Sequence, residues 1–108
     1  MQFLVLGHDG DDSDALARRL AVREAHLALG HKLRDEGKML YGAAILDETS
    51  KMVGSVLICD FASRQDLDHW LEEEPYVTGQ VWKRVEIREC RVGPTFEGKI
   101  PGKKQITG

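Results

Sequence analysis

The sequence predicts an α+β fold in which two helices pack on a four-stranded antiparallel sheet. Three observations support this prediction. Strand-like and helix-like segments follow one another in the order β-α-β-β-α-β. The first helix-like segment is long and rich in Ala and Leu. The first and third strand-like segments are apolar at alternate positions on both faces, as expected for strands in the middle of a sheet.

The N-terminal half contains the first strand and the long helix. Residues 2–7 are a short apolar run that a polar cluster follows, which predicts a strand and then a loop. The helix is predicted over 14–36, with Asp12 or Ser13 as its N-cap. Gly37 is a suitable C-terminal stop.

The C-terminal half contains the remaining strands and the second helix. Strands are predicted over 38–46, 52–61 and 81–90. Ser63 is expected to cap a short helix that Pro75 ends, because the residue before a proline avoids helical angles. This order is the ferredoxin-like, or split βαβ, pattern.

The elements belong to one domain over residues 1–92, and residues 93–108 are a Gly/Pro/Lys-rich tail. We expect this tail to be flexible or to lie along a partner. Two helices can cover only one face of the sheet, so the other face would expose an apolar patch of a size that monomers rarely tolerate. A homodimer that packs sheet to sheet is the expected solution.

Composition excludes several classes of function. The chain has 108 residues, of which 42% are hydrophobic and 31% charged, as in a globular domain. A net charge of −3 gives no basic footprint for nucleic acid, and no apolar run reaches the roughly 20 residues of a membrane span. The N-terminus lacks the features of a signal peptide, which predicts a cytoplasmic protein. Cys59 and Cys90 stand alone without a CxxC, so we expect buried thiols and no metal site.

A polar stripe on the long helix is the first sign of a functional site. Arg19, Arg23, His26 and Gly30 follow the spacing i, i+4, i+7, i+11. They lie between two apolar groups, Leu16, Leu20 and Leu27 on one side and Val22, Leu29 and Leu33 on the other. The stripe therefore predicts a polar-lined hollow under the helix. The alternative is a hydrogen-bonded core histidine, with the arginines paired to strand carboxylates such as Asp60 or Glu86.

Other polar residues could face the same hollow. Ser55 follows Gly54 on a central strand, where glycine lets a ligand or backbone come close. Glu74 directly precedes Pro75, and Asp9 follows the first strand. The alternatives are a serine satisfied by backbone and a run of glutamates that forms a solvated face.

Four segments of the chain resemble the YCII-related (YciI-like) family. They are RLAVREAHL in the first helix, GKMLYGAAI in the second strand, GSVLI in the third and EEPYV after the second helix. The resemblance covers roughly residues 2–91. It implies a ferredoxin-like fold, a dimeric α+β barrel and a pocket in which a histidine is paired with an acid.

The resemblance also implies which residues form the site. By position, the family histidine falls on His26 and its acid on Glu74, where the family more often has aspartate. A second acid falls near Asp9, and the family's Gly-Ser pair falls on Gly54 and Ser55. The Gly-Pro pair common at the second strand is Gly42-Ala43 here. The reaction class associated with the family is a lyase-type dehydrochlorination of a chlorinated hydroxyhydroquinone.

Two functions fit these features. In the first, the protein is a cofactor-free enzyme in which His26 transfers a proton, and Glu74 or Asp9 orients the imidazole. The substrate is then a small organic, aromatic or quinone-like molecule. Its expected binding residues are Arg19, Arg23, Gly54, Ser55 and Tyr76. In the second, the same hollow belongs to a non-catalytic small-molecule-binding or accessory dimer.

Overall fold

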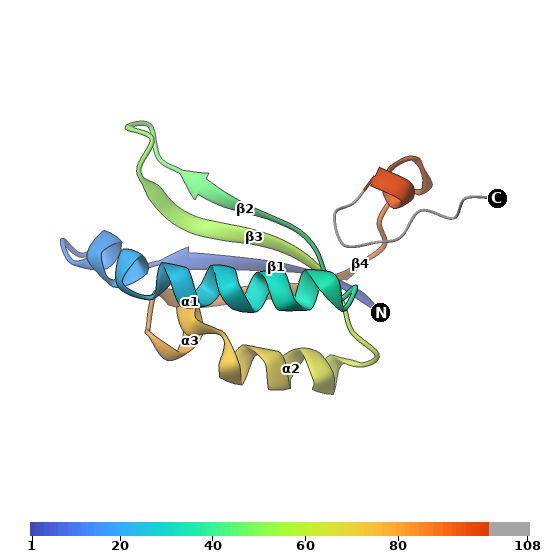
Figure 1. Cartoon of the computed structure of the whole chain (residues 1–108). Helices are drawn as coiled ribbons and strands as arrows, with labels where there is room; N and C mark the ends of the chain where they lie inside the picture. Colours follow the sequence, from blue (N-terminus) through green and yellow to red (C-terminus); the bar gives the residue numbers. More distant parts are fainter. Residues whose placement is uncertain (100–108) are drawn as a thin grey trace.

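The fold is the α+β arrangement that the sequence predicts. The computed structural model describes residues 1–99. The elements are β1 (Gln2–Asp9), α1 (Ala15–Asp35), β2 (Met39–Leu46), β3 (Met52–Asp60), α2 (Arg64–Glu73), α3 (Pro75–Thr78), β4 (Trp82–Cys90) and the 3-10 helix η1 (Pro94–Lys99) (Figure 1). The predicted tail thus begins as a short 3-10 helix, and its residues 100–108 lie outside the described part.

The sheet is fully antiparallel and has the strand order β2-β3-β1-β4. The two apolar strands, β1 and β3, are therefore the central ones, as predicted. Val5 of β1 lies opposite Leu57 of β3 on one side and Ile87 of β4 on the other. All three α-helices lie on the same side of this sheet (Figure 1).

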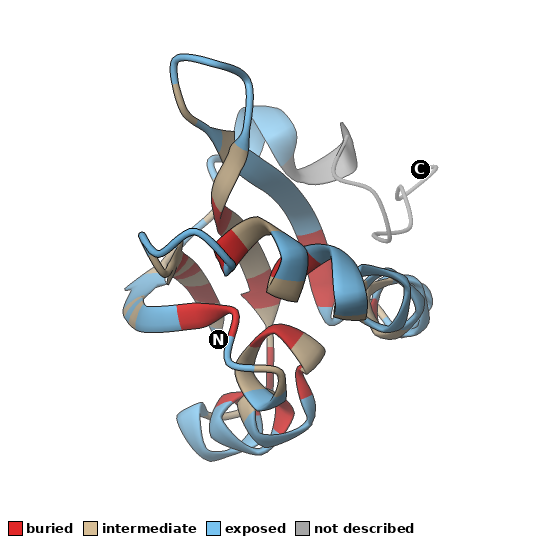
Figure 2. Cartoon of the chain, turned by 90° about the vertical axis from the view of Figure 1, so that its left-hand side faces the viewer, coloured by how far each residue is buried: buried red, intermediate tan, exposed pale blue. Residues whose placement is uncertain are grey.

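The core lies between the sheet and the helices, where the buried segments of several elements meet (Figure 2). Phe3, Val5, Leu57 and Cys59 contribute the sheet's side of this layer, and every one is at most 6% exposed. From the helices come Leu33 of α1, Leu67 and Trp70 of α2, and Tyr76 of α3. Full burial of one such side chain stabilises the fold by roughly 1.5–3 kcal/mol. This packed layer holds the neighbouring polar side chains in fixed positions.

The start of α1 differs from the prediction. Neither Asp12 nor Ser13 is the N-cap; Asp14 takes that position and makes no side-chain cap bond. Asp12 instead pairs with Arg18, whose two terminal nitrogens donate to it at 2.9 and 2.6 Å. The same carboxylate also accepts from the Asp14 amide at 3.3 Å, so Asp12 holds the start of α1 without being its N-cap. The Arg18 bond also lowers the pKa of Asp12 well below its ordinary value.

Two other predicted helix boundaries are confirmed. Gly37 follows α1 with φ of 75°, a left-handed conformation that favours glycine, and donates to the Arg34 carbonyl. Ser63 caps α2 by accepting from the Asp66 amide at 3.1 Å. After α2, the expected irregular connection contains the one-turn helix α3, which begins at Pro75.

Only one of the two apolar groups on α1 belongs to the core. Val22, Leu29 and Leu33 pack against it, whereas Leu20 and Leu27 are 52% and 40% exposed. Helix α1 lies beside α3 on one side, and on another side Leu27 borders the pocket between α1 and the strands β2 and β3.

The second face of the sheet carries no α-helix (Figure 1). Leu4, Leu6, Val56 and Ile58 are half-buried there, at alternate positions of the two central strands. Near η1 this face has a cavity of about 590 Å³ lined by Leu4, Tyr41, Ile58, Cys90 and Phe96 among others. Within residues 1–99 no helix is both long enough and apolar enough to span a bilayer.

Candidate active site

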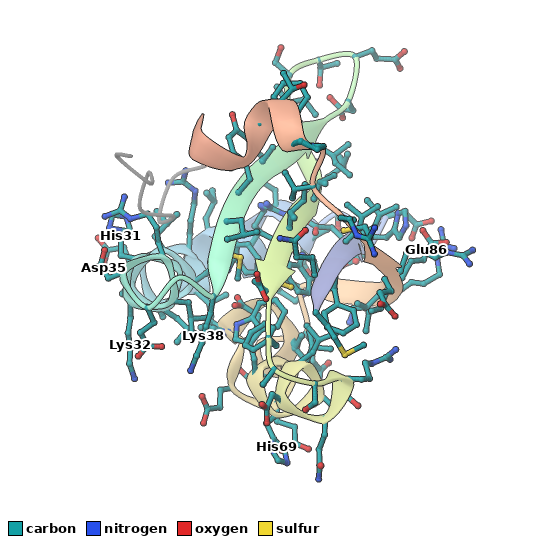
Figure 3. All side chains as sticks on the ribbon, turned by 90° about the vertical axis from the view of Figure 1, so that its right-hand side faces the viewer. His31, Lys32, Asp35, Lys38, His69 and Glu86 are labelled. Atoms are coloured by element: carbon teal, nitrogen blue, oxygen red, sulfur yellow. The ribbon has the colours of Figure 1, made fainter. Side chains whose placement is uncertain are left out.

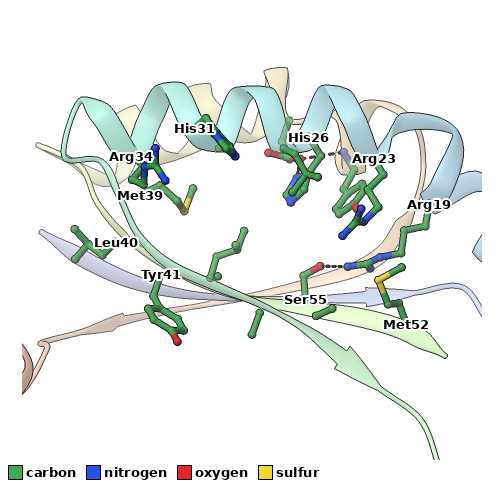
Figure 4. Close-up of a pocket in the computed structure, with 18 residues that line it drawn as sticks. Arg19, Arg23, His26, His31, Arg34, Met39, Leu40, Tyr41, Met52 and Ser55 are labelled. Carbon is green, nitrogen blue, oxygen red and sulfur yellow. Dashed lines mark hydrogen bonds and ion pairs between the residues drawn. The ribbon is translucent and has the colours of Figure 1, made fainter. Parts of the chain in front are cut away.

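A pocket of about 480 Å³ lies between α1 and the strands β2 and β3 (Figure 4). From α1 it is lined by Arg19, Arg23, His26, Leu27, Gly30, His31 and Arg34. All four members of the predicted polar stripe are among these residues. A Cβ added at Gly30 would meet nothing within 4 Å, so the space beside this glycine is open.

His26 lies against a buried acid. Its Nδ1 is hydrogen-bonded to Oε1 of Glu74, whose side chain is 2% exposed. Because a carboxylate can only accept, Nδ1 carries the hydrogen and Nε2 of the neutral ring keeps its lone pair. The side chain of His26 is 15% exposed, and its Nε2 has no hydrogen-bond partner within residues 1–99. In the neutral ring this nitrogen is a hydrogen-bond acceptor without a partner in the described part of the chain.

The backbone fixes Glu74 in place. It is both the C-cap of α2 and the N-cap of α3, with the extended angles, φ −65° and ψ 121°, that a following proline favours. Its Oε1 also accepts from the Tyr76 amide at 3.2 Å. The acid therefore reaches His26 from a junction that two helices hold rigid. Its extra methylene relative to aspartate does not prevent the contact.

Aromatic rings hold the imidazole in orientation. Tyr76 stacks on His26 with centroids 3.9 Å apart and an interplanar angle of 13°, and Trp82 approaches edge-on at 6.3 Å. Gly7 leaves room for the indole of Trp82, since a Cβ there would collide with it. Burial raises the pKa of Tyr76, so its phenol stays neutral at physiological pH.

Arg19 belongs to a second buried network, in which both terminal nitrogens are bonded while the buried Nε has no partner within residues 1–99. Its Nη1 donates to both oxygens of Asp9 at 3.0 Å, and its Nη2 donates to Ser55 Oγ at 2.8 Å. The side chains of Arg19 and Asp9 are only 3% and 2% exposed. Burial raises the pKa of Asp9, and the guanidinium offsets part of that effect. Asp9 is therefore the partner of Arg19 and makes no bond to His26.

Ser55 is left with one hydrogen to donate. Its Oγ accepts from Arg19 Nη2 and, at 3.3 Å, from Trp82 Nε1. A hydroxyl has two acceptor positions and one donor, so these two bonds leave only the O–H hydrogen. No acceptor for that hydrogen is found within residues 1–99. Since Ser55 lines the pocket, the hydrogen is available to a bound oxygen atom.

The remaining predicted residues separate into two groups. Arg23 is exposed, lines the pocket and makes no ion pair within residues 1–99. Gly54, in contrast, is not part of the lining, because it faces the carbonyl oxygen of Gly7, which an added Cβ would approach to 2.7 Å. The arginine pairing suggested with Asp60 or Glu86 is not the one Arg19 makes.

Sequence reasoning missed the opposite wall and the far end of the pocket. The wall is formed by β2, whose Gly42, Ala43 and Ala44 line it. Three small residues in succession on an edge strand were the available signal. His31 of α1 is exposed but also lines the pocket, whereas His69 points away from the body of the molecule on α2 (Figure 3). No group of three His, Cys, Asp or Glu side chains in the described part could hold a metal ion.

Known proteins resemble this chain in sequence and in fold. The chain is 33% identical to Protein YciI of Escherichia coli O6:H1 (strain CFT073) over 84 residues, which are 72% of this chain and 86% of that protein. An uncharacterised protein of Haemophilus influenzae is 34% identical over 84 residues, with the same coverage.

A solved structure with the same fold is the 5-chloro-2-hydroxyhydroquinone dehydrochlorinase TftG of Burkholderia phenoliruptrix AC1100, in complex with 2,5-dihydroxybenzoquinone. It superposes with a TM-score of 0.75 and 24% identity, over 88% of this chain and 98% of that one. The sequence profile of the YCII-related domain matches residues 1–91. The chain therefore belongs to the YciI-like family of YCII-related domains.

Proposed function

We propose that the pocket is the active site of a cofactor-free enzyme that removes a proton from a small hydroxylated organic molecule. The observation that carries this proposal is the state of His26. Its Nδ1 is bound to buried Glu74, while its Nε2 is unpartnered within residues 1–99 and lies in the lining of the pocket. A histidine held in this way suits general acid–base catalysis near neutral pH.

The polar groups around His26 can stabilise the negative charge that removal of a proton creates on the substrate. His26 Nε2 accepts a proton from an O–H or an acidic C–H, and the electron pair left behind develops on an enolate-type oxygen. The free O–H of Ser55 and the unpaired Arg23 are positioned on the pocket lining to stabilise that oxygen. When the electron pair then expels a leaving group, the substrate loses HX overall and His26 carries the proton. Glu74 stabilises the imidazolium in the interval.

The similar structure supports our proposal for the substrate class. The dehydrochlorinase acts on a chlorinated hydroxyhydroquinone and was solved with a dihydroxybenzoquinone. A hydroxylated aromatic or quinone-like ring also suits this pocket, where the stacked Tyr76 and His26 and the side chain of Leu57 line the space. We therefore propose lyase chemistry, with elimination of HCl or a similar acid from such a ring.

We also propose that the protein acts as a homodimer packed through the open sheet face. Leu4, Leu6, Val56 and Ile58 form an apolar strip there that the helices leave uncovered. A charge in the middle of this strip, in Val56→Glu, should shift the protein from dimer to monomer in sedimentation velocity. A wild-type protein that sediments as a monomer at micromolar concentration contradicts this part of the proposal.

Turnover of candidate rings tests the enzymatic proposal. Purified protein is incubated with chlorinated and unchlorinated hydroxyhydroquinones under anaerobic conditions, and products and chloride are followed by mass spectrometry and ion chromatography. His26→Gln should lower turnover by roughly 10²–10⁴-fold, the usual effect of losing an acid–base group. His69→Gln, which alters an exposed histidine on α2, is the matched control and should keep full turnover. Full turnover by His26→Gln rules out the assignment, and binding without conversion identifies a binding module.

A further inference from the structure

The pocket extends well beyond the groups that the proposed reaction uses. Its lining runs along α1 from Arg19 to Arg34, about 22 Å of helix at 1.5 Å per residue. Its volume of about 480 Å³ is roughly three times that of an engineered cavity of about 150 Å³ that accepts one benzene ring. A single ring at His26 therefore leaves the end near Arg34 empty.

The end near Arg34 has its own chemistry. His31 and Arg34 lie there with Met39 and Leu40, apart from His26, Arg23 and Ser55 (Figure 4). Arg34 has one ion pair in the described part of the chain, at 3.5 Å to the adjacent Asp35, and these side chains are 46% and 73% exposed. An exposed pair of this kind is weak and yields readily to a better anion.

The charges of the lining favour a negative ligand. Its carboxylate from the described residues is Glu74, which is buried and bound to His26. Arg19 is neutralised by Asp9, so Arg23 and Arg34 carry the charge that a ligand would meet. These two arginines are eleven residues apart on α1, almost exactly three turns, and therefore share one face of the helix.

We infer that the substrate has two ends, a hydroxylated ring at His26 and a carboxylate on a flexible tail that binds Arg34. This inference rests on the proposed function and names the substrate class for the same site. Arg34 follows His26 by eight residues, about 12 Å along the axis. Helical side chains point toward the N-terminus. Both side chains lean the same way, but the longer arginine reaches back further than the histidine, so the gap between them is shorter than about 12 Å and suits a tail of about four methylenes.

Gly30 lies between the two ends of the pocket. It is four residues after His26 and four before Arg34, so a side chain at this position would project between them. Nothing lies within 4 Å of a Cβ placed there, and hence packing does not require glycine. The open position gives the tail a path from the ring to the guanidinium.

Calorimetric titration with three anaerobic probes tests the inference. They are hydroquinone, 5-(2,5-dihydroxyphenyl)pentanoate and the matching pentanamide, which has the same length but no charge. The wild-type protein should bind the carboxylate about tenfold more tightly than the amide, as expected for one charge-assisted contact. Arg34→Gln should remove this difference and leave hydroquinone binding unchanged.

Two further variants test whether the tail of the ligand passes Gly30 and whether its carboxylate binds Arg34 specifically. Lys32→Gln removes the same charge from the last turn of α1 but lies outside the lining, on a different side of the helix from His31, so it should keep the tenfold preference (Figure 3). Gly30→Leu should weaken both tailed probes and spare hydroquinone. Circular dichroism confirms that each variant is folded.

The outcomes separate this inference from the proposed function. If no ring binds in a manner that His26→Gln abolishes, the proposed function fails and the inference fails with it. If hydroquinone binds through His26 but the carboxylate gains nothing over the amide, only the two-ended substrate is excluded. The same holds if the preference survives in Arg34→Gln or disappears in Lys32→Gln.

Discussion

Arg19 and His26 are two turns apart on the same face of α1, and each lies against a buried carboxylate. In the Arg19–Asp9 pair both terminal nitrogens of the guanidinium are bonded, to the two carboxylate oxygens and to Ser55, and the unpartnered Nε is buried. The His26–Glu74 pair is open at one atom, because Nε2 is unpartnered within residues 1–99 and borders the pocket. The side-chain exposures agree, at 3% for Arg19 and 15% for His26.

This difference distinguishes a structural pair from a chemical one. Folding removes both pairs from water, which raises the free energy of the folded state unless each polar group has a hydrogen-bond or ion-pair partner. In the Arg19 network the cost is offset within the protein, and the result is a fixed position for Ser55. In the His26 pair one ring nitrogen, Nε2, has no partner within residues 1–99 and can form a hydrogen bond with a ligand. A charged residue on an inward face is thus a better candidate for catalysis when its partners leave an atom unused in a side chain that is partly exposed at a pocket.

Glu74→Gln should have the largest effect. The amide keeps the size of the side chain, and its oxygen can still accept from the Tyr76 amide and from Nδ1 of His26, but it carries no negative charge to stabilise the imidazolium. We expect turnover to fall by roughly 10²–10⁴-fold with little change in KM. Steady-state kinetics on a chlorinated hydroxyhydroquinone that the wild-type protein converts measures this loss. Glu73→Gln on the exposed side of α2 is the control, and equal losses in both variants would refute the role of Glu74.

Arg19→Met should reduce stability more than any chemical step. It leaves Asp9 as an unpaired buried carboxylate, at a cost of about 3–5 kcal/mol in the free energy of unfolding. The double variant Arg19→Met/Asp9→Leu should recover most of this loss, because no buried charge remains. Urea denaturation at pH 7 measures both. If the losses of the single variants Arg19→Met and Asp9→Leu simply add in the double variant, Arg19 and Asp9 do not act as a coupled pair.

The pH dependence of stability gives a check on the same pair. Burial raises the pKa of Asp9 above its ordinary value of 3.8, so the folded protein binds this proton more tightly than the unfolded chain. Its contribution to stability is therefore largest below pH 3.8 and declines as the pH rises through the folded pKa. Asp9→Asn should lack this decline.

Ser55→Ala should affect both networks moderately. It leaves Arg19 Nη2 and Trp82 Nε1 without their acceptor, which costs about 1–3 kcal/mol of stability for buried donors. It also removes the O–H offered to the substrate oxygen, so turnover should fall by about tenfold or more. Thermal unfolding and kinetics on the same preparation separate the two effects. Unchanged turnover in a folded variant would show that the hydroxyl acts only within the protein.

Gly30→Ala should have the smallest effect, and it should raise the free energy of unfolding instead of lowering it. Alanine in a helix interior is more stable than glycine by about 0.5–1 kcal/mol, and the added methyl group would meet no neighbour within 4 Å. The free energy of unfolding should therefore rise by that amount. A fall would indicate that a second copy of the chain contacts this glycine.

The fold and the composition of the site were largely predictable, but the pairing was not. Alternation in 2–7 and 52–61 was enough to place the central strands, and the spacing of Arg19, Arg23, His26 and Gly30 was enough to indicate the pocket. The choice between Asp9 and Glu74 as the partner of His26 was open, because it depends on the register of α1 over β1 and on the junction at Pro75. Periodicity defines a face of a helix but not the element that lies against it.

For the same reason the burial of α1 was predicted only in part. Leu20 and Leu27 follow the helical period as well as Leu29 and Leu33 do, yet they are exposed. Which apolar flank meets the core is decided by the position of α1 beside α3, a tertiary property. Gly54 was assigned to the ligand side, but strand alternation gives it to the opposite face, next to Gly7.

All the cationic side chains of the pocket come from one continuous segment, residues 19–34 of α1, while the opposite wall is built by β2 and β3. Ligand preference and scaffold are thus encoded in separate stretches of the gene. Grafting this sixteen-residue segment between members of the family should exchange their selectivity in a single step. A library confined to its pocket-facing codons would sample new specificities while the sheet stays intact.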